Sequence, residues 1–107
     1  EHGFYTERMK AQGIEVMVPA VDDRKIVHDI IFNELCQGQV RAVARRAYLE
    51  IIDRAKTNGA DCVILGCTEI GLLIDPDTLP LPGFDSTTIH ADAAIRFALG
   101  DEAARAA

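Results

Sequence analysis

The stretch GADCVILGCTEI, residues 59–70, carries the strongest local signal for how this 107-residue chain folds. Asp61 to Leu65 is an apolar run of strand length, which is typical of a strand buried in a parallel sheet. Gly66 then leads into Cys67-Thr68-Glu69-Ile70, which can open a short helix through Leu73. The expected local structure is therefore a strand, a tight turn and a helix.

Four other segments carry helix signals: apolar residues at helical spacing, a capping residue, or a closing glycine. The clearest is Val40 to Ala55, whose apolar positions recur at i, i+3, i+4 and i+7 before the stop Asn58-Gly59. The other three are Phe4–Gln12 closed by Gly13, a helix capped by Asp22 that ends at Gly38, and a last helix capped by Ser86 or Thr87 that carries Ala91 to Leu99. The tail after Gly100 is expected to fray.

Strand signals lie between these helices. Ile14 to Val18 alternates apolar and polar residues and stops at Pro19, and Leu81 to Phe84 is a shorter candidate strand. Strands that alternate with helices indicate an α/β fold with a parallel sheet flanked by helices. No linker divides the chain, so residues 1–107 are predicted to form one domain. Because so few strands are readable, we expect this sheet to be incomplete.

The composition excludes several classes of protein. The 17 acidic side chains outnumber the 11 basic ones, and the net charge of −6 offers no attraction to phosphate backbones or anionic membranes. The longest apolar run, Cys62 to Leu65, is far shorter than the roughly 20 residues of a membrane span. We therefore expect a cytoplasmic protein that binds neither nucleic acid nor membrane.

The three cysteines, Cys36, Cys62 and Cys67, form neither a disulfide framework nor a zinc motif, since their number is odd and no C-x-x-C is present. Cys62 alternates with Ile64 on the predicted strand and is expected in the core. Cys67 directly follows that strand, at the edge where α/β sheets bind ligands. From the residues alone, Cys67 is either a functional thiol or a small apolar group lining a turn.

Two features of the sequence act on the pKa of Cys67 in opposite directions. The positive end of a following helix favours a thiolate and can hold a substrate carboxylate. Glu69 places a carboxylate nearby, which raises the pKa of a thiol. His90, near the start of the last helix, could relay a proton or bind a carboxylate, although a hydrogen bond to the backbone is the more common role for a histidine there.

Residues 59–70 resemble the second active-site motif of the aspartate/glutamate racemases, which are cofactor-independent amino-acid racemases. Residues 23–38 and 84–91 resemble the corresponding segments of the same family, so the resemblance covers nearly the whole chain. It implies a reaction in which one cysteine thiolate removes the Cα proton and a second cysteine returns a proton to the opposite face. By position, Cys67 corresponds to one of these cysteines, and Gly66, Thr68 and Glu69 to its substrate-binding neighbours.

The resemblance also implies what the chain lacks. Family members have two similar α/β lobes, each of which supplies one cysteine to a site between them, and they are expected to be dimers. The first-lobe cysteine, usually followed by Asn and Thr, has no counterpart in residues 1–107, so we expect this carboxyl-terminal lobe to be inactive alone. No cofactor and no metal are expected.

The substrate and the exact chemistry stay open at this stage. Cys36 stands near the point where some aspartate racemases have a lysine for the distal carboxylate, which favours a specificity broader than aspartate. A related isomerase or decarboxylase of the same superfamily is one alternative. The other is a non-catalytic module that binds a small carboxylate at residues 66–70.

Overall fold

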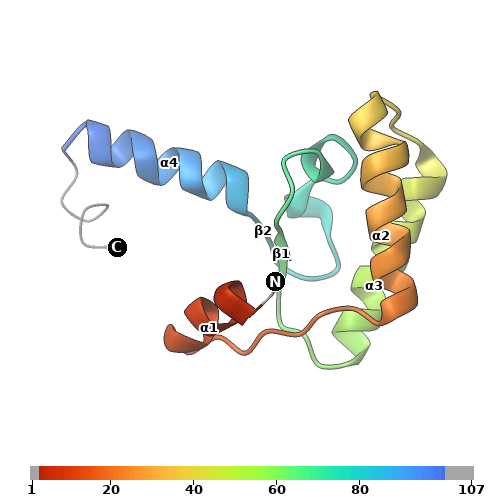
Figure 1. The fold of residues 1–107 in the computed structure, drawn as a ribbon, viewed down its shortest axis with the longest axis horizontal. Helices are drawn as coiled ribbons and strands as arrows, with labels where there is room; N and C mark the ends of the chain where they lie inside the picture. Colours follow the sequence, from red (N-terminus) through yellow and green to blue (C-terminus); the bar gives the residue numbers. More distant parts are fainter. Residues whose placement is uncertain (1–2, 101–107) are drawn as a thin grey trace.

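The computed structural model describes residues 3–100 and has an α/β fold, in which helices flank a two-stranded parallel sheet (Figure 1). The fold class predicted from the sequence is confirmed. The elements follow the order α1 (Gly3–Ala11), α2 (Val21–Asn33), η1 (Leu35–Gln37), α3 (Ala42–Thr57), β1 (Val63–Leu65), η2 (Ile70–Leu72), η3 (Pro76–Thr78), β2 (Gly83–Asp85) and α4 (Ser86–Ala98), where η marks a 3-10 helix. None of the helices in this range is long and apolar enough to span a membrane.

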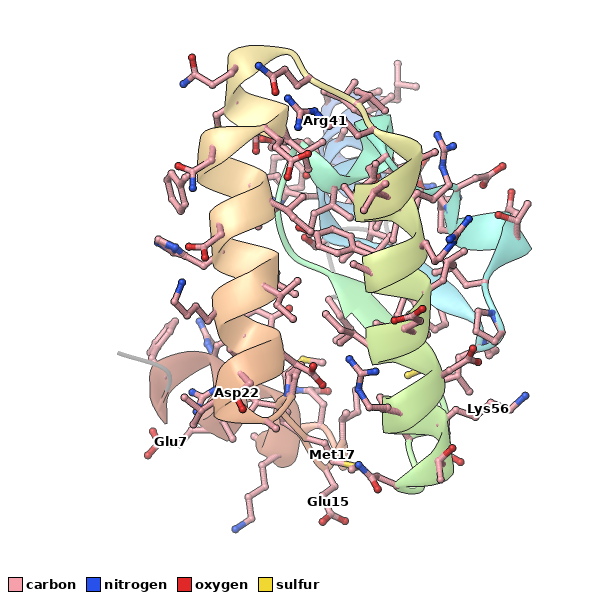
Figure 2. All side chains as sticks on the ribbon, turned by 90° about the vertical axis from the view of Figure 1, so that its right-hand side faces the viewer. Glu7, Glu15, Met17, Asp22, Arg41 and Lys56 are labelled. Atoms are coloured by element: carbon pink, nitrogen blue, oxygen red, sulfur yellow. The ribbon has the colours of Figure 1, made fainter. Side chains whose placement is uncertain are left out.

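Helices α2 and α3 cover one side of the sheet and form the core with it. They run antiparallel, so that Asp22 at the start of α2 and Lys56 at the end of α3 lie at the same end of the pair (Figure 2). Arg54 donates two hydrogen bonds across the pair to Asp23, at 2.6 and 3.0 Å. The core cluster consists of Ile30, Leu35, Ala44, Tyr48, Ile52, Leu65, Ile70, Leu73, Ile74 and Leu81.

The apolar stripe predicted for the third helix is buried only in part. Ala44, Tyr48, Ile51 and Ile52 are buried as expected. Val43, in the first turn of α3, is 77% exposed, and Val40 before the helix is also exposed. Val43 lies about 100° around the helix axis from the buried Ala44, outside the face that packs on the core, and Val40 precedes the helix.

The sheet is buried on only one face, which corrects the expectation for Cys62. Leu65 points toward α3 and is 4% exposed, whereas Ile64 on the opposite face is 36% exposed. Cys62 is exposed as well, and the prediction that it lies in the core is wrong. Alternate residues of an extended segment share a face, so Cys62 lies with Ile64 on the uncovered face.

The segment Ile14–Val18 does not form the strand that its alternation predicts. The sheet of the described residues contains β1 and β2 alone, and residues 14–20 join neither of them. Strand geometry requires a hydrogen-bonded neighbour, which an alternating sequence cannot supply by itself. Ile14, Met17 and Val18 are consequently exposed. The expected fraying after Gly100 concerns residues outside the described range.

Both side-chain caps predicted for helices are wrong. Asp22 lies inside the first turn of α2, whose N-cap is Ala20 and has no side-chain hydrogen bond. Helix α4 is capped by Asp85, the last residue of β2, whose Oδ1 accepts a hydrogen bond from the Thr87 backbone N–H at 3.0 Å. Aspartate is a strong capping residue, and here it follows directly on a strand, which leaves Ser86 free for another contact.

Candidate functional site

The predicted site residues lie at the carboxyl end of β1. Leu65 is held in the core, and the chain leaves the strand through the exposed Gly66. Cys67 comes next and is half-buried, because it packs partly against the core cluster. β1 and β2 are parallel, with Leu65 opposite Asp85, so the start of α4 is at the same edge of the sheet.

Cys67 and Glu69 form a hydrogen-bonded pair. The Cys67 Sγ donates to Glu69 Oε2 at a distance of 2.8 Å. Burial, followed by the hydrogen bond to the Glu69 carboxylate, raises the pKa of the Cys67 thiol. The same hydrogen bond, together with one from Thr68, lowers the pKa of Glu69. At neutral pH the pair therefore consists of a protonated thiol and an ionised carboxylate.

The helix that follows Cys67 is shorter than the sequence predicts. In place of a helix from Cys67 through Leu73, only the single 3-10 turn Ile70–Leu72 forms, with Glu69 at its N-cap position. The positive potential at a helix N-terminus comes from several aligned peptide dipoles, and one turn supplies few of them. Burial and the carboxylate therefore have the larger effect on the thiol.

Tyr48 links this edge of the sheet to the two core helices. Its side chain is buried in α3, and its hydroxyl donates to the Val27 carbonyl of α2 at 3.1 Å. Burial, followed by the charges of Cys67 and Glu34, raises the pKa of Tyr48 to about 12. Tyr48 is therefore a neutral hydrogen-bond donor at physiological pH, and Cys67 packs against the core cluster that contains it.

The other candidate side chains are not brought together with this pair. His90 is exposed on α4, and within residues 3–100 no hydrogen bond joins its imidazole to Cys67, to Glu69 or to a backbone group. Cys36 is exposed in η1. Thr68 is exposed beside Cys67, and its side chain hydrogen-bonds to Glu69. No group of His, Cys, Asp and Glu side chains able to hold a metal ion occurs in this range.

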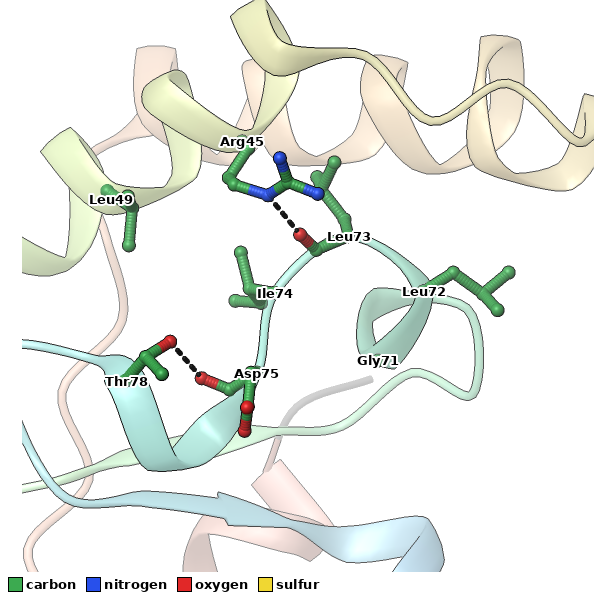
Figure 3. A pocket seen from close by; sticks show the side chains of 8 residues that line it. All are labelled: Arg45, Leu49, Gly71, Leu72, Leu73, Ile74, Asp75 and Thr78. Carbon is green, nitrogen blue, oxygen red and sulfur yellow. Dashed lines mark hydrogen bonds between the residues drawn. The ribbon is translucent and has the colours of Figure 1, made fainter.

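A hollow of about 280 Å³ lies beside the segment that follows the Cys67–Glu69 pair (Figure 3). Its wall includes Arg45 on α3, whose Nε donates to the Leu73 carbonyl at 2.7 Å, and residues 71–75. Neither Cys67 nor Glu69 lines it. In the described part of the chain, the thiol–carboxylate pair therefore lies at the carboxyl end of β1, outside this hollow.

The contact that the sequence signals least clearly involves Ser86. Its hydroxyl donates to the Leu65 carbonyl at 3.1 Å and so joins the start of α4 to the end of β1. A serine next to a predicted helix start is usually interpreted as an N-cap, so its hydrogen bond to the neighbouring strand is not expected from the sequence. Its pairing partner is 21 residues away in the sequence.

The family of this chain is shown by sequence comparison. A model of the Asp/Glu/hydantoin racemase family matches residues 1–94. The chain belongs to this family. The resemblance of residues 23–38, 59–70 and 84–91 to these racemases is thereby confirmed, and the family is one of isomerases that act on small molecules.

Two solved racemase-family structures are similar to this one. A Yersinia pestis protein provisionally assigned as an Asp/Glu racemase shares 43% sequence identity over 92% of this chain and 44% of its own, with a TM-score of 0.84. An aspartate racemase homologue from Pyrococcus horikoshii OT3 shares 32% identity over 89% of this chain and 42% of its own, with a TM-score of 0.79. The chain therefore spans less than half the length of the racemase-family structures that it matches.

Proposed function

We propose that residues 1–107 are the carboxyl-terminal half of a two-lobed amino-acid racemase and that Cys67 is one of its two acid–base groups. The observation that carries this proposal is the 2.8 Å contact between Cys67 Sγ and Glu69 Oε2 at the carboxyl edge of β1. The family and the position after the strand support a catalytic thiol over a thiol that merely lines a turn.

Racemisation requires a proton to leave Cα on one face and another proton to arrive on the opposite face. Because Cys67 keeps its proton and donates it in a hydrogen bond to Glu69, Cys67 enters the reaction as the acid. A second cysteine, supplied by the other lobe, takes the Cα proton as a thiolate, and Cys67 gives its proton to the resulting carbanion. The S–H bond of Cys67 breaks as the new Cα–H bond forms, and the reverse reaction exchanges the two roles.

Substrate binding is assigned to the residues around the thiol. Gly66 and Thr68 are both exposed, and we assign them to the substrate carboxylate, toward which the Thr68 hydroxyl would turn from its hydrogen bond with Glu69. The ionised Glu69 attracts the substrate ammonium group. These groups recognise what all α-amino acids share, so aspartate, glutamate and other amino acids are all candidate substrates. The reaction as written uses side chains alone and needs neither cofactor nor metal.

The second lobe is proposed to cover the open side of the sheet, by which we mean the side away from α2 and α3. Large apolar residues are exposed there on the strands and on α4, among them Ile64, Phe84 and Ile95. Helix α4 extends from the end of β2, away from α2 and α3 (Figure 1). We propose that a lobe docked on this side places the second cysteine opposite Cys67, and that the complete enzyme is a cytoplasmic dimer.

The test is hydrogen exchange during turnover by the complete gene product. In D2O, aspartate or glutamate should gain deuterium at Cα while the opposite enantiomer appears, and Cys67→Ala should abolish both signals. Cys62→Ala is the matched control, because Cys62 is an exposed thiol on the same segment, and it should retain them. Unchanged turnover by Cys67→Ala would remove Cys67 from the mechanism.

The same experiment separates the alternatives. Saturable binding of aspartate without exchange at Cα would favour a carboxylate-binding module. Release of carbon dioxide, or formation of a geometric isomer from a dicarboxylate, would favour one of the related chemistries of the superfamily.

A further inference from the structure

The two strands of the sheet continue into the site by very different routes. Leu65 and Asp85 are paired at the last position of β1 and β2. After Leu65 the chain passes through Gly66 to Cys67, whereas after Asp85 helix α4 begins at once with Ser86. The Ser86 hydroxyl donates to the Leu65 carbonyl at 3.1 Å, two residues before Cys67.

We infer that Ser86 is a positioning residue for Cys67, because its hydroxyl fixes the direction in which the chain leaves β1 and thereby keeps Sγ within reach of Glu69. The inference rests on the proposed role of Cys67 in racemisation. Ser86 is not itself placed against the substrate and acts through the Leu65 carbonyl.

The first support is that Ser86 is not needed as a helix cap. Asp85 Oδ1 accepts the Thr87 N–H at 3.0 Å, and Asp85 Oδ2 accepts the Thr88 hydroxyl at 2.9 Å. Both carboxylate oxygens of the cap are therefore occupied by residues of α4 itself. Ser86, which lies between the cap and these two threonines, instead bonds to the neighbouring strand.

The second support is that side-chain packing does not restrain the chain at Gly66 itself. A Cβ built at Gly66 would have no heavy atom within 4 Å, so packing does not restrain this residue. The Leu65 side chain is anchored in the core and the residue is paired with Asp85, and the Ser86 hydroxyl adds a side-chain hydrogen bond to its carbonyl. Without the Ser86 hydroxyl, the Leu65 carbonyl loses one of its restraints and the chain at Gly66 can shift, which should lengthen the 2.8 Å contact between Cys67 and Glu69.

The pKa of the Cys67 thiol reports this geometry. The hydrogen bond to Glu69 is one of the causes that raise it. A substitution that moves Sγ away from the carboxylate should lower the pKa, increase the thiolate fraction near pH 8, and speed alkylation, since the thiolate is the nucleophile.

The experiment measures the rate of alkylation of each cysteine by iodoacetamide between pH 6 and pH 10, resolved by peptide mass spectrometry. Cys36 and Cys62 are both exposed and serve as internal references in the same sample. In Ser86→Ala, Cys67 should be alkylated at least about twofold faster near pH 8, and the midpoint of its rate–pH curve should shift to lower pH. The rates of the reference cysteines should be unchanged. Ser86→Thr, which retains the hydroxyl, should restore the wild-type profile.

Thr88→Val is the matched control, because it removes a hydroxyl hydrogen bond at the same helix start without touching β1. Thr88→Val should leave the Cys67 alkylation profile unchanged. If weakening of α4 alone caused the change, the profile would shift equally in Thr88→Val and Ser86→Ala. In a Glu69→Gln background, Ser86→Ala should have no further effect, as expected for two residues that act through one contact.

An unchanged Cys67 profile in folded Ser86→Ala, or an equal shift in Thr88→Val, would overturn the inference. Ser86→Gly is the second hydroxyl-free variant if Ser86→Ala fails to fold, since Asp85 still caps α4 in both. Alkylation does not depend on turnover. A protein that proves not to racemise therefore leaves this result standing, and a racemase with an unshifted Ser86→Ala profile contradicts only the inference about Ser86.

Discussion

The two sides of the small sheet differ in what covers them, although the sequence supplies apolar residues to both. On the covered side, helices α2 and α3 pack over the strands, and Ile52 is 6% exposed. On the open side, Ile95 of α4 is 59% exposed. Both isoleucines lie at helical spacing within amphipathic helices, so the pattern alone does not distinguish them. Hydrophobic periodicity therefore identifies which face of a helix is apolar, but it does not identify the element that covers that face.

The largest effect expected from this comparison is on stability. Ile52→Ala should lower the free energy of unfolding by about 2 to 5 kcal/mol, because it leaves a cavity in the core cluster. Ile95→Ala should lower it by no more than about 0.5 kcal/mol in residues 1–107, because its side chain already contacts water. Urea denaturation followed by circular dichroism measures both, and equal losses would contradict the division into a covered and an open side.

The second prediction uses the same Ile95→Ala substitution in the complete, two-lobed protein. If the second lobe covers α4, the substitution should now cost about 1.5 to 3 kcal/mol, the range for burying an aliphatic side chain. Denaturation of the complete protein and its variant gives the value. A cost that stays near zero would show that the open side is not where the second lobe docks.

Tyr48 offers a test of the covered side that depends on pH. Its folded pKa is raised from 10.0 to about 12, so the protonated phenol stabilises the fold below about pH 10, and this stabilisation is lost as the pH rises toward 12. Tyr48→Phe should remove this alkaline loss and cost about 1 kcal/mol at neutral pH, because the hydrogen bond to Val27 is absent. Unfolding free energies at a series of pH values check both parts, and a Phe variant that keeps the full alkaline slope would assign it to another group.

The smallest expected effect concerns the Cys67–Glu69 pair, which lies at the carboxyl end of β1. Glu69→Gln removes the charge that faces Cys67 but keeps the size of the side chain, so the pKa of the thiol should fall. Alkylation of Cys67 near pH 8 should become faster by roughly a factor of two or more, with Cys62 as the reference. A slower reaction would mean that the Glu69 carboxylate lowers the pKa of the Cys67 thiol, which is the opposite of the expected effect.

Much of the fold could be predicted because it depends on local signals. The apolar spacing of α3 identified the buried Ala44, Tyr48 and Ile52, and Gly13 and Gly59 follow their helices with positive φ, as helix-ending glycines do. The position of Cys67 and Glu69 after β1 follows from one short segment of sequence. Their mutual contact is also local, since the two residues are separated by Thr68 alone.

The features that could not be predicted depend on distant residues. Ile14–Val18 has the alternation of a strand but no neighbouring strand within residues 3–100. Cys62 has the apolar character of a core residue, yet its face of the sheet is uncovered. Ser86 bonds to a carbonyl that only the pairing of β1 with β2 brings near. In each case the local sequence favours one structure, and contacts with distant residues determine whether that structure forms.

The parallel pairing of only two strands has a further consequence for handling the protein. In a sheet of this kind each strand has a neighbour on one flank only, so both flanks of the described sheet are edges. Sheet edges act as templates for strand addition by other chains, particularly beside apolar surface such as Ile64 and Phe84. Residues 1–107 produced alone should therefore self-associate as concentration rises, and a light-scattering series over concentration would reveal it before any assay is attempted.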